Sequence, residues 1–379
     1  MTVNPKELDR AWSFDDVAIV PGAVTTNPQM VEPKFNLGSF EFNIPIIASA
    51  MDAVVDVEMA VKLTKLGAAG VLNLEGIQTR YDDTEEIFDS IAESRNADVT
   101  ALMQKVYSKE INLELISKRV EDIKKAGGTA IVSATPQNTK KFAPIAKDAC
   151  VDIFVVQSTV TTANHVSRSL NGLKLKELVK DMGNMPILVG NTVDFNATLE
   201  LLETGINGIL VGVGPGAACT SREVLGIGMP QVSATIETSH ARNTYFEKTG
   251  RYVPIITDGG IRTGGDFSKA ICSGANAVMI GSPFASTIEA PGKGYHWGLA
   301  TPHAELPRGT RVHVGQDKTL ETLLFGPTSL TNGTENLIGA LKTSMSTCGA
   351  TTIEEFHNTR MIIAPAIKTE GKIYQMKAD

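Results

Sequence analysis

Short runs of apolar, mostly β-branched residues alternate along the chain with longer segments in which apolar residues recur every three or four positions. The first pattern indicates buried strands and the second indicates amphipathic helices. Eight strand-like runs occur: IPIIASA from Ile44, GVLNL from Gly70, TAIVSA from Thr129, DIFVVQS from Asp152, PILVGN from Pro186, GILVGVG from Gly208, VPIITDGG from Val253 and AVMIGS from Ala277. Because they are almost continuously apolar, we expect strands buried on both faces, as in a parallel sheet covered by helices.

This alternation is compatible with two α/β architectures, an open doubly wound sheet and a closed (β/α)8 TIM barrel. The count of eight favours the barrel, and so do the polar or glycine residues after nearly every strand, where a barrel builds its site. The helix expected over residues 115–125, ending at Gly127 and Gly128, is typical of the connections. We therefore predict a single (β/α)8 barrel domain over residues 1–379.

Three stretches do not fit the repeating unit. Residues 78–115 are charged, and we predict a short irregular segment there that includes a strand-like TALMQKV. Residues 290–315 are rich in Pro, Gly, His and Arg, which predicts a lid after the last strand. Residues 360–379 are expected to form a C-terminal tail that docks or frays.

Composition excludes several classes of partner. The 379 residues carry a formal net charge of −7, which disfavours the cationic surface that non-specific nucleic-acid binding requires. No window approaches ~18 uninterrupted apolar residues, and the N-terminal MTVNPKELDR does not resemble a signal peptide. We expect a cytoplasmic protein, without nucleic-acid or membrane partners, that binds a small ligand in a local pocket.

The four cysteines lie far apart and form no C-x-x-C pair, so the sequence predicts neither a zinc site nor a disulfide framework. Cys219 stands out because it follows a strand and a Gly-Pro-Gly turn, with hydroxyl residues at the next two positions. A loop thiolate is a strong nucleophile near neutral pH. We predict that Cys219 attacks an electrophilic ring carbon while Thr220 or Ser221 orients a proton or water. The other three are interpreted as small buried apolar residues: Cys150, Cys272 and Cys348.

A second group of candidates follows the last two predicted strands, in ITDGGIRTGGD and VMIGSPFA. Gly260, Gly281 and Ser282 can donate hydrogen bonds to a phosphate, which barrels commonly bind after strands seven and eight. Asp258 could accept hydrogen bonds from vicinal ribose hydroxyls. Glycine after a strand usually marks only a turn, so it is the order of these motifs that indicates a nucleotide.

Six motifs in the same order resemble the IMP dehydrogenase/GMP reductase family over nearly the whole chain. They are SFDDVAIVPG at Ser13, IPIIASAMDAVVD at Ile44, VGN at Val189, VGVGPGAACTSR at Val211, TDGGIRTGGD at Thr257 and VMIGSP at Val278. Most IMP dehydrogenases carry a pair of CBS modules where this chain has only the segment 78–115. The chain is most similar to the short, CBS-free branch of bacterial IMP dehydrogenase-like proteins.

The resemblance implies a covalent mechanism on a purine nucleoside monophosphate. Cys219 would attack C2 of IMP, hydride would pass to NAD, and water would release XMP from the thioimidate. The resemblance also implies that Ser49 and Met51 line the nucleotide pocket, and that Asn191 lies near the cysteine and the nicotinamide.

A potassium ion and an oligomer are implied in the same way. The ion would be bound by backbone carbonyls of the cysteine loop, at Gly214, Gly216 and Cys219. The TEGK segment at Thr369 resembles part of the C-terminal segment through which a neighbouring subunit contributes to that site. The expected assembly is a homotetramer or a homo-octamer.

The chain departs from the family pattern at several positions. Ala217 stands where a Ser usually contacts phosphate, Gln157 replaces an Asp near the nicotinamide, and His296 takes the place of a phosphate-binding Tyr. Residues 301–314 are too short to contain the Arg-Tyr pair with which IMP dehydrogenases activate water. Arg308 occupies the position of the glutamate that GMP reductases use with ammonia.

Three functions therefore stay open. Arg308, helped by Ser221, could position or activate water, which favours an IMP dehydrogenase. Arg308 and Arg311 could equally be solvated or structural charges of the loop. The alternatives are an NADPH-dependent GMP reductase and a non-catalytic purine-nucleotide-binding barrel, because a fold and its binding loops can persist when chemistry is lost.

Overall fold

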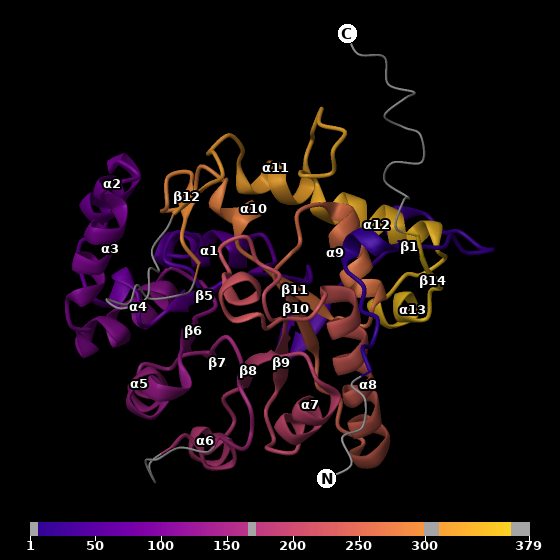
Figure 1. Cartoon of the computed structure of the whole chain (residues 1–379), viewed down its shortest axis with the longest axis horizontal. Helices are drawn as coiled ribbons and strands as arrows, with labels where there is room; N and C mark the ends of the chain where they lie inside the picture. Colours follow the sequence, from indigo (N-terminus) through magenta and orange to yellow (C-terminus); the bar gives the residue numbers. More distant parts are fainter. Residues whose placement is uncertain (1–6, 166–171, 299–310, 365–379) are drawn as a thin grey trace.

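Eight parallel strands close into a barrel in the computed structural model, which describes residues 7–165, 172–298 and 311–364 (Figure 1). Each strand coincides with one of the eight predicted runs, and the (β/α)8 barrel is confirmed. The order around the barrel follows the sequence, and the last strand pairs with the first. The strands are β4 (Ile46–Ala48), β5 (Ala69–Asn73), β6 (Ile131–Ala134), β7 (Ile153–Gln157), β8 (Ile187–Thr192), β9 (Gly208–Val211), β10 (Ile255–Asp258) and β11 (Ala277–Ile280).

Helices surround the barrel and bury one apolar face each (Figure 1). In α4 (Leu113–Lys125), Ile116, Val120 and Ile123 recur at helical spacing and are buried, which confirms the predicted helix. Its first turn is capped by Asn112, whose side chain accepts a hydrogen bond from the Glu114 amide. The other covering helices are α1 (Val57–Lys65), α5 (Pro136–Asp148), α6 (Leu175–Met182), α7 (Phe195–Leu202), α8 (Gln231–Thr249), α9 (Gly264–Cys272), α10 (Ser282–Ala285), α11 (Leu320–Phe325), α12 (Leu337–Thr347) and α13 (Ile353–His357).

The amino-terminal end of the barrel is closed by a hairpin of β2 (Phe35–Leu37) and β3 (Phe40–Phe42). Leu37 is fully buried and lies close to Gly208 at the start of β9. Since all eight strands are parallel, their carboxyl ends gather at the opposite end of the barrel, where the predicted site should lie.

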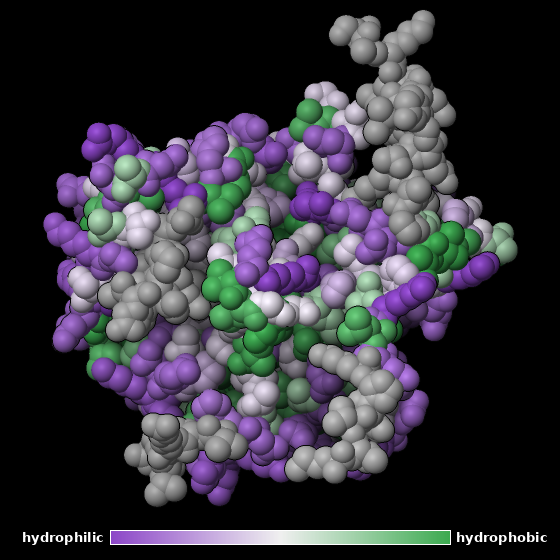
Figure 2. Space-filling view, viewed as in Figure 1, coloured by the Kyte–Doolittle hydropathy of each residue, from purple (hydrophilic) through white to green (hydrophobic). Residues whose placement is uncertain are grey.

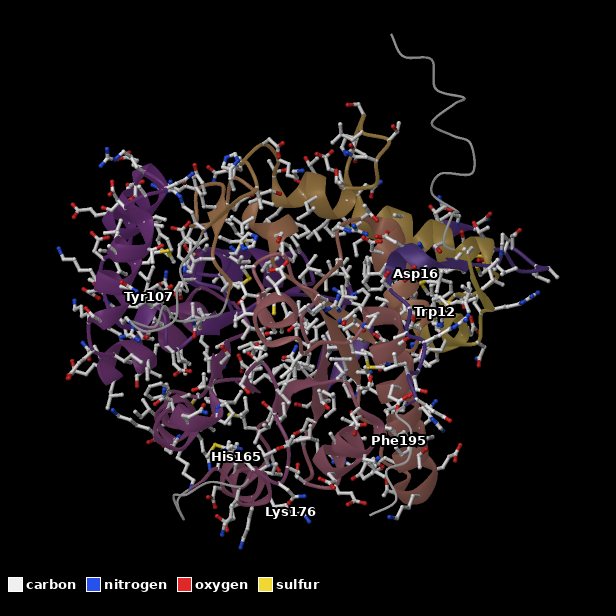
Figure 3. All side chains as sticks on the ribbon, in the orientation of Figure 1. Trp12, Asp16, Tyr107, His165, Lys176 and Phe195 are labelled. Carbon is white, nitrogen blue, oxygen red and sulfur yellow. The ribbon has the colours of Figure 1, made fainter. Side chains whose placement is uncertain are left out.

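Residues 78–115 are not an irregular segment with a strand. They contain two helices, α2 (Glu85–Glu93) and α3 (Val99–Ser108), and TALMQKV is part of α3. The helix is explained by Val99, Met103 and Val106, which are buried at helical spacing in a small apolar cluster separate from the barrel core. Figure 3 shows Tyr107 in this part of the molecule, at one side of the barrel.

The chain ends and the predicted lid are partly described. In the predicted tail, β14 (Met361–Ile363) pairs with β1 (Val17–Ile19), so that part docks as a strand. In the predicted lid, β12 (Tyr295–His296) pairs with β13 (Val312–His313). Arg308 and Thr369 lie outside the described residues.

Two further expectations concern cysteines and membranes. Cys272 is buried as predicted, Cys348 is half-buried, and Cys150 is exposed, so the interpretation of Cys150 as a buried apolar residue was wrong. Cys150 follows the end of α5 with a φ of 61°, which turns the chain at the surface. Within the described ranges, no helix has the length and apolarity needed to cross a bilayer.

Candidate active site

A cavity of about 840 Å³ opens at the carboxyl ends of the barrel strands. Residues after β4, β7, β8, β9, β10 and β11 line it, so the barrel brings together side chains that are far apart in the sequence. Of the predicted site residues within the described ranges, Thr220 and Ser221 are not part of its lining. The predicted residues that line it are Ser49, Met51, Gln157, Asn191, Gly214, Gly216, Cys219, Asp258, Gly260, Gly281, Ser282 and His296.

Cys219 lies on the loop after β9, half-buried at the cavity wall. Its Sγ is 3.4 Å from Oγ of Ser221, to which the thiol donates. Ser221 is buried at the start of a π-helical turn, η4 (Ser221–Leu225), whereas Thr220 is exposed. Ser221, rather than Thr220, is therefore the hydroxyl that this geometry associates with the thiol.

The glycines of this loop allow a close turn of the backbone. Gly214 has a φ of 83°, and a Cβ added there would lie 2.5 Å from Cγ of Arg222. The Gly216 carbonyl accepts a hydrogen bond from the Cys219 amide at 3.0 Å. One of the three carbonyls predicted to bind potassium is thus already engaged. The potassium site stays a prediction, because the three carbonyls alone do not complete a coordination shell.

Asp258 ends β10 and is held by two side-chain amides from β7 and β8, which are not adjacent to β10 in the barrel. Its Oδ2 accepts hydrogen bonds from Asn191 Nδ2 at 2.8 Å and from Gln157 Nε2 at 2.9 Å. Burial raises the pKa of Asp258 to about 6, while these two hydrogen bonds act in the opposite direction. The carboxylate is therefore fixed in position and is mostly ionised at neutral pH.

His296 and Ser282 form the other polar pair of the cavity. Ser282 Oγ and His296 Nε2 are 2.8 Å apart, and burial lowers the pKa of His296 to about 4. The imidazole is therefore neutral near pH 7, and its Nδ1 has no hydrogen-bond partner among the described residues. Close by, a Cβ at Gly281 would lie 2.5 Å from Sδ of Met51 and 3.6 Å from Oγ of Ser49. Any side chain at this position would therefore require Met51 to move.

Comparison with known proteins identifies the family of this chain. The profile of the IMP dehydrogenase/GMP reductase domain matches residues 11–300. This chain belongs to that family. It is 35% identical to an uncharacterized oxidoreductase of Mycolicibacterium smegmatis, over 93% of this chain and 96% of that one. It is 32% identical to the inosine-5′-monophosphate dehydrogenase of Cryptosporidium parvum, over 77% of this chain and 72% of that one.

A solved structure supports the same assignment. The IMP dehydrogenase/GMP reductase-like protein from Corynebacterium glutamicum superposes with a TM-score of 0.89 at 32% identity, covering 96% of this chain and 97% of its own. The protein is therefore a member of an oxidoreductase family, and its recognition from six motifs is confirmed.

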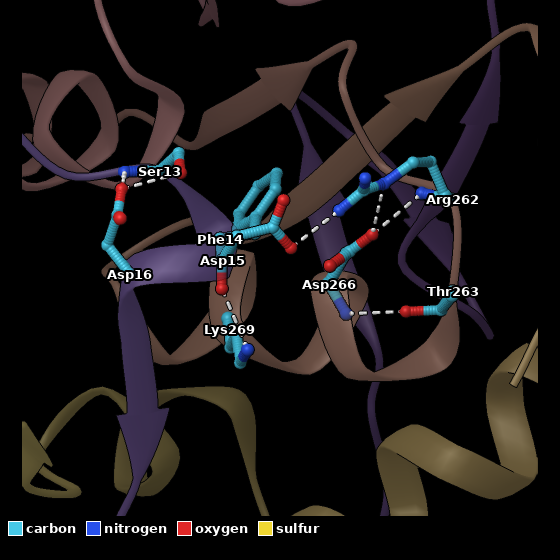
Figure 4. A network of polar contacts seen from close by, with 8 residues as sticks. All are labelled: Ser13, Phe14, Asp15, Asp16, Arg262, Thr263, Asp266 and Lys269. Carbon is cyan, nitrogen blue, oxygen red and sulfur yellow. Dashed lines mark hydrogen bonds and ion pairs between the residues drawn. The ribbon is translucent and has the colours of Figure 1, made fainter. Parts of the chain in front are cut away.

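Sequence reasoning missed the part of the cavity wall that comes from the N-terminal segment. Ser13, Phe14 and Asp15 line the cavity, and Figure 4 shows how they are attached to the barrel. Arg262 donates to Asp15 at 2.9 Å and to Asp266 at 3.1 Å, and Lys269 donates to the Phe14 carbonyl at 2.8 Å. The SFDDV motif was the available signal, but its partners lie more than 240 residues away.

The α2–α3 pair was also missed as a support for the cavity. Trp297 follows His296 directly, and its Nε1 donates to the Tyr107 hydroxyl at 2.7 Å. That hydroxyl donates in turn to the Asp52 carboxylate, next to Met51. Arg311, on the other side of residues 299–310, donates to three carbonyls at the end of α2. The two helices therefore hold chain segments that carry cavity residues.

Apolar side chains are exposed next to the cysteine loop. Val224, Leu225 and Ile227 each leave more than half of their surface in solvent. Figure 2 shows apolar side chains gathered near the centre of the face in view. This region borders the cavity, because Arg222 of the same turn is part of its lining.

Proposed function

We propose that this protein oxidises IMP to XMP with NAD, through a covalent bond between Cys219 Sγ and C2 of the purine. The observation that carries the proposal is that one cavity is lined by the Cys219 thiol, the Asp258 carboxylate and the polar groups of Gly260, Gly281 and Ser282. At about 840 Å³, the cavity is near the upper end of the ~300–1,000 Å³ typical of ligand pockets. Its size leaves room for a nicotinamide beside the nucleotide.

Each part of the nucleotide has matching groups in the cavity. Ionised Asp258 would accept hydrogen bonds from the ribose hydroxyls. The amides of Gly260 and Gly281 would donate to the phosphate, together with either the Ser282 hydroxyl or neutral His296, since the bond between these two leaves one of them a free hydrogen. Ser49 and Met51 would line the nucleotide pocket and direct the base toward the half-buried Cys219.

The reaction needs a nucleophile, a hydride acceptor and water. The Cys219 thiolate would add to C2 of IMP, the hydrogen on C2 would leave with its electron pair, and water would then replace sulfur to give XMP and the free thiol. NAD, when bound, supplies the acceptor for that hydride, with Asn191 as a predicted neighbour of its nicotinamide. Ser221 would position the water, together with Arg308.

The test follows absorbance at 340 nm with purified protein, IMP, NAD and potassium. We expect NADH and XMP in equal amounts from the wild type, and none from Cys219→Ala. Cys150→Ala is the matched control, because that thiol is exposed and remote from the cavity lining. A parallel assay contains GMP and NADPH.

Two results would reject the proposal. Consumption of NADPH with release of ammonia from GMP would identify a reductase, and binding of IMP without turnover would identify a non-catalytic nucleotide-binding barrel. Repeating the assay without potassium tests whether activity requires the predicted ion. Sedimentation velocity tests the proposed homotetramer or homo-octamer, and cell fractionation tests the proposed cytoplasmic location.

A further inference from the structure

Three polar side chains form a closed set of hydrogen bonds in the cavity. Gln157 Nε2 donates to Asp258 Oδ2 at 2.9 Å and to Asn191 Oδ1 at 3.1 Å. Asn191 Nδ2 donates to the same Asp258 Oδ2 at 2.8 Å and to the Gly212 carbonyl at 2.9 Å. A side-chain amide has two N–H donors. Both donors of each amide are therefore engaged within the protein.

The remaining polar atom of Gln157 is closed to solvent. Gln157 is 7% exposed, and its Oε1 is buried without a hydrogen-bond partner among the described residues. Turning the amide over would bring Oε1 against the carboxylate of Asp258, which is repulsive while Asp258 is ionised. The orientation of Gln157 is thus set by Asp258, and Gln157 has no free donor for a bound dinucleotide.

Asp258 has two oxygens with different surroundings. Oδ2 accepts from both amides, whereas no hydrogen bond within the described part of the chain reaches Oδ1. Asp258 lines the cavity. One oxygen therefore anchors the carboxylate, and the other is left for a ligand hydroxyl.

We propose that Gln157 is a positioning residue for the nucleotide ribose, acting through Asp258, rather than a residue that contacts the dinucleotide. Its amide fixes the carboxylate through Oδ2 and favours the ionised form, so that Oδ1 accepts strongly from the ribose hydroxyls. This proposal rests on the proposed nucleotide-binding function. A Glu at position 157, which has the same length, would instead place its carboxylate at hydrogen-bond distance from the Asp258 carboxylate.

The experiment measures binding without any dinucleotide, by calorimetry between pH 5.5 and pH 8.5. The ligands are IMP and 2′,3′-dideoxy-IMP, and the readout is the ratio of their dissociation constants. Both ligands carry the same phosphate and base, so titration of either cancels in the ratio. Other titratable groups around the cavity cancel in the same way: Asp15, Cys219, Arg222, Arg262, His296 and Lys318.

Removing the donor should weaken ribose recognition in a pH-dependent way. In the wild type we expect IMP to be preferred, with the preference growing as the pH rises through about 6. In Gln157→Leu, loss of one donor raises the pKa of Asp258, so the preference at pH 6.5 should fall by about tenfold. At pH 8.5, where Asp258 is ionised in both proteins, the two ratios should approach each other.

A second variant should not recover the preference for IMP at high pH, unlike Gln157→Leu. In Gln157→Glu, two carboxyl groups in contact share one proton over this pH range. The preference for IMP should therefore stay below the wild-type value even at pH 8.5. Gln137→Glu makes the same change at an exposed position in the first turn of α5, away from the cavity, and should match the wild type.

The outcomes separate this proposal from the proposed function. Equal ratios in wild type and Gln157→Leu at every pH, or a deficit that does not change with pH, would overturn the positioning role. If the wild type does not bind IMP at all, the proposed function fails instead. Binding of 2′,3′-dideoxy-IMP shows that each variant is folded. If one variant does not fold, the other still tests the positioning role of Gln157.

Discussion

Replacing Arg311 should loosen helix α2, although the two are separated by about 220 residues in sequence. The Arg311 guanidinium donates to the carbonyls of Ile91, Ala92 and Ser94, which close the last turn of α2. A helix ends with four carbonyls that lack partners within the helix, and a cation there is also favoured by the helix dipole. Arg311 is thus the cap of a helix formed far from it in the sequence.

The expected magnitude follows from these contacts. Hydrogen bonds to a charged group contribute about 1.5–3 kcal/mol each, but water can replace part of them at this half-buried end of the helix. The guanidinium also lies 4.3 Å from the ring centroid of Tyr295, a cation–π contact of about 0.5–1 kcal/mol. For Arg311→Ala we expect a loss of about 2–4 kcal/mol in the local stability of α2, and for Arg311→Lys roughly half of that.

Native-state hydrogen exchange measures this quantity directly, because it reports the opening of individual segments. A loss of about 2–4 kcal/mol corresponds to exchange faster by roughly 30- to 900-fold in α2. The matched control is Arg95→Ala, which removes an exposed ion pair with Asp98 and should cost less than about 1 kcal/mol. If exchange in α2 is within threefold of wild type in Arg311→Ala, or equal in both variants, the capping role is refuted.

Two further predictions concern single groups. Burial raises the pKa of Asp52 to about 6, so the folded state binds this proton more tightly than the unfolded state, and the free energy of unfolding should fall as the pH rises from about 4 to 6. Asp52→Asn should remove about 3 kcal/mol of this pH dependence, measured by urea unfolding, and an unchanged pH dependence would contradict the prediction. Gly281→Ala should weaken IMP binding at least tenfold in calorimetry, because its Cβ would push Met51 into the cavity, whereas Gly265→Ala, whose Cβ meets its nearest atom at 3.6 Å, should not.

The barrel could be predicted because its strands are encoded locally. Each of the eight runs is apolar on both faces and ends in polar or glycine residues. Each strand could therefore be found without knowing which strand it pairs with or in what register. TALMQKV was misread because, within seven residues, its apolar positions fit a strand as well as a helix. The helical period appears only when Val99 and Tyr107 are included.

The candidate site could be predicted only where chemistry and chain order coincide. Cys219, Asp258 and Ser282 each follow a strand, and parallel strands bring such positions to one end of the barrel. The Arg262–Asp15 and Trp297–Tyr107 contacts join residues 247 and 190 positions apart, and no periodic pattern encodes them. Whether a lone cysteine such as Cys150 is buried likewise depends on where the preceding helix ends, which the sequence does not fix to the residue.

The departures of this chain from its family are best understood together with the residues that they contact. Gln157 places an amide at 2.9 Å from the Asp258 carboxylate, whose pKa burial raises to about 6, whereas a Glu of the same length would bring a second carboxylate there. His296 is neutral and paired with Ser282, so it gives the cavity wall a polar group without a buried charge. Each of these two side chains is therefore matched to the residue that it contacts. A difference between relatives at such a position is therefore best compared together with its contact partner. It indicates a change in function only when the new side chain and its partner no longer satisfy each other.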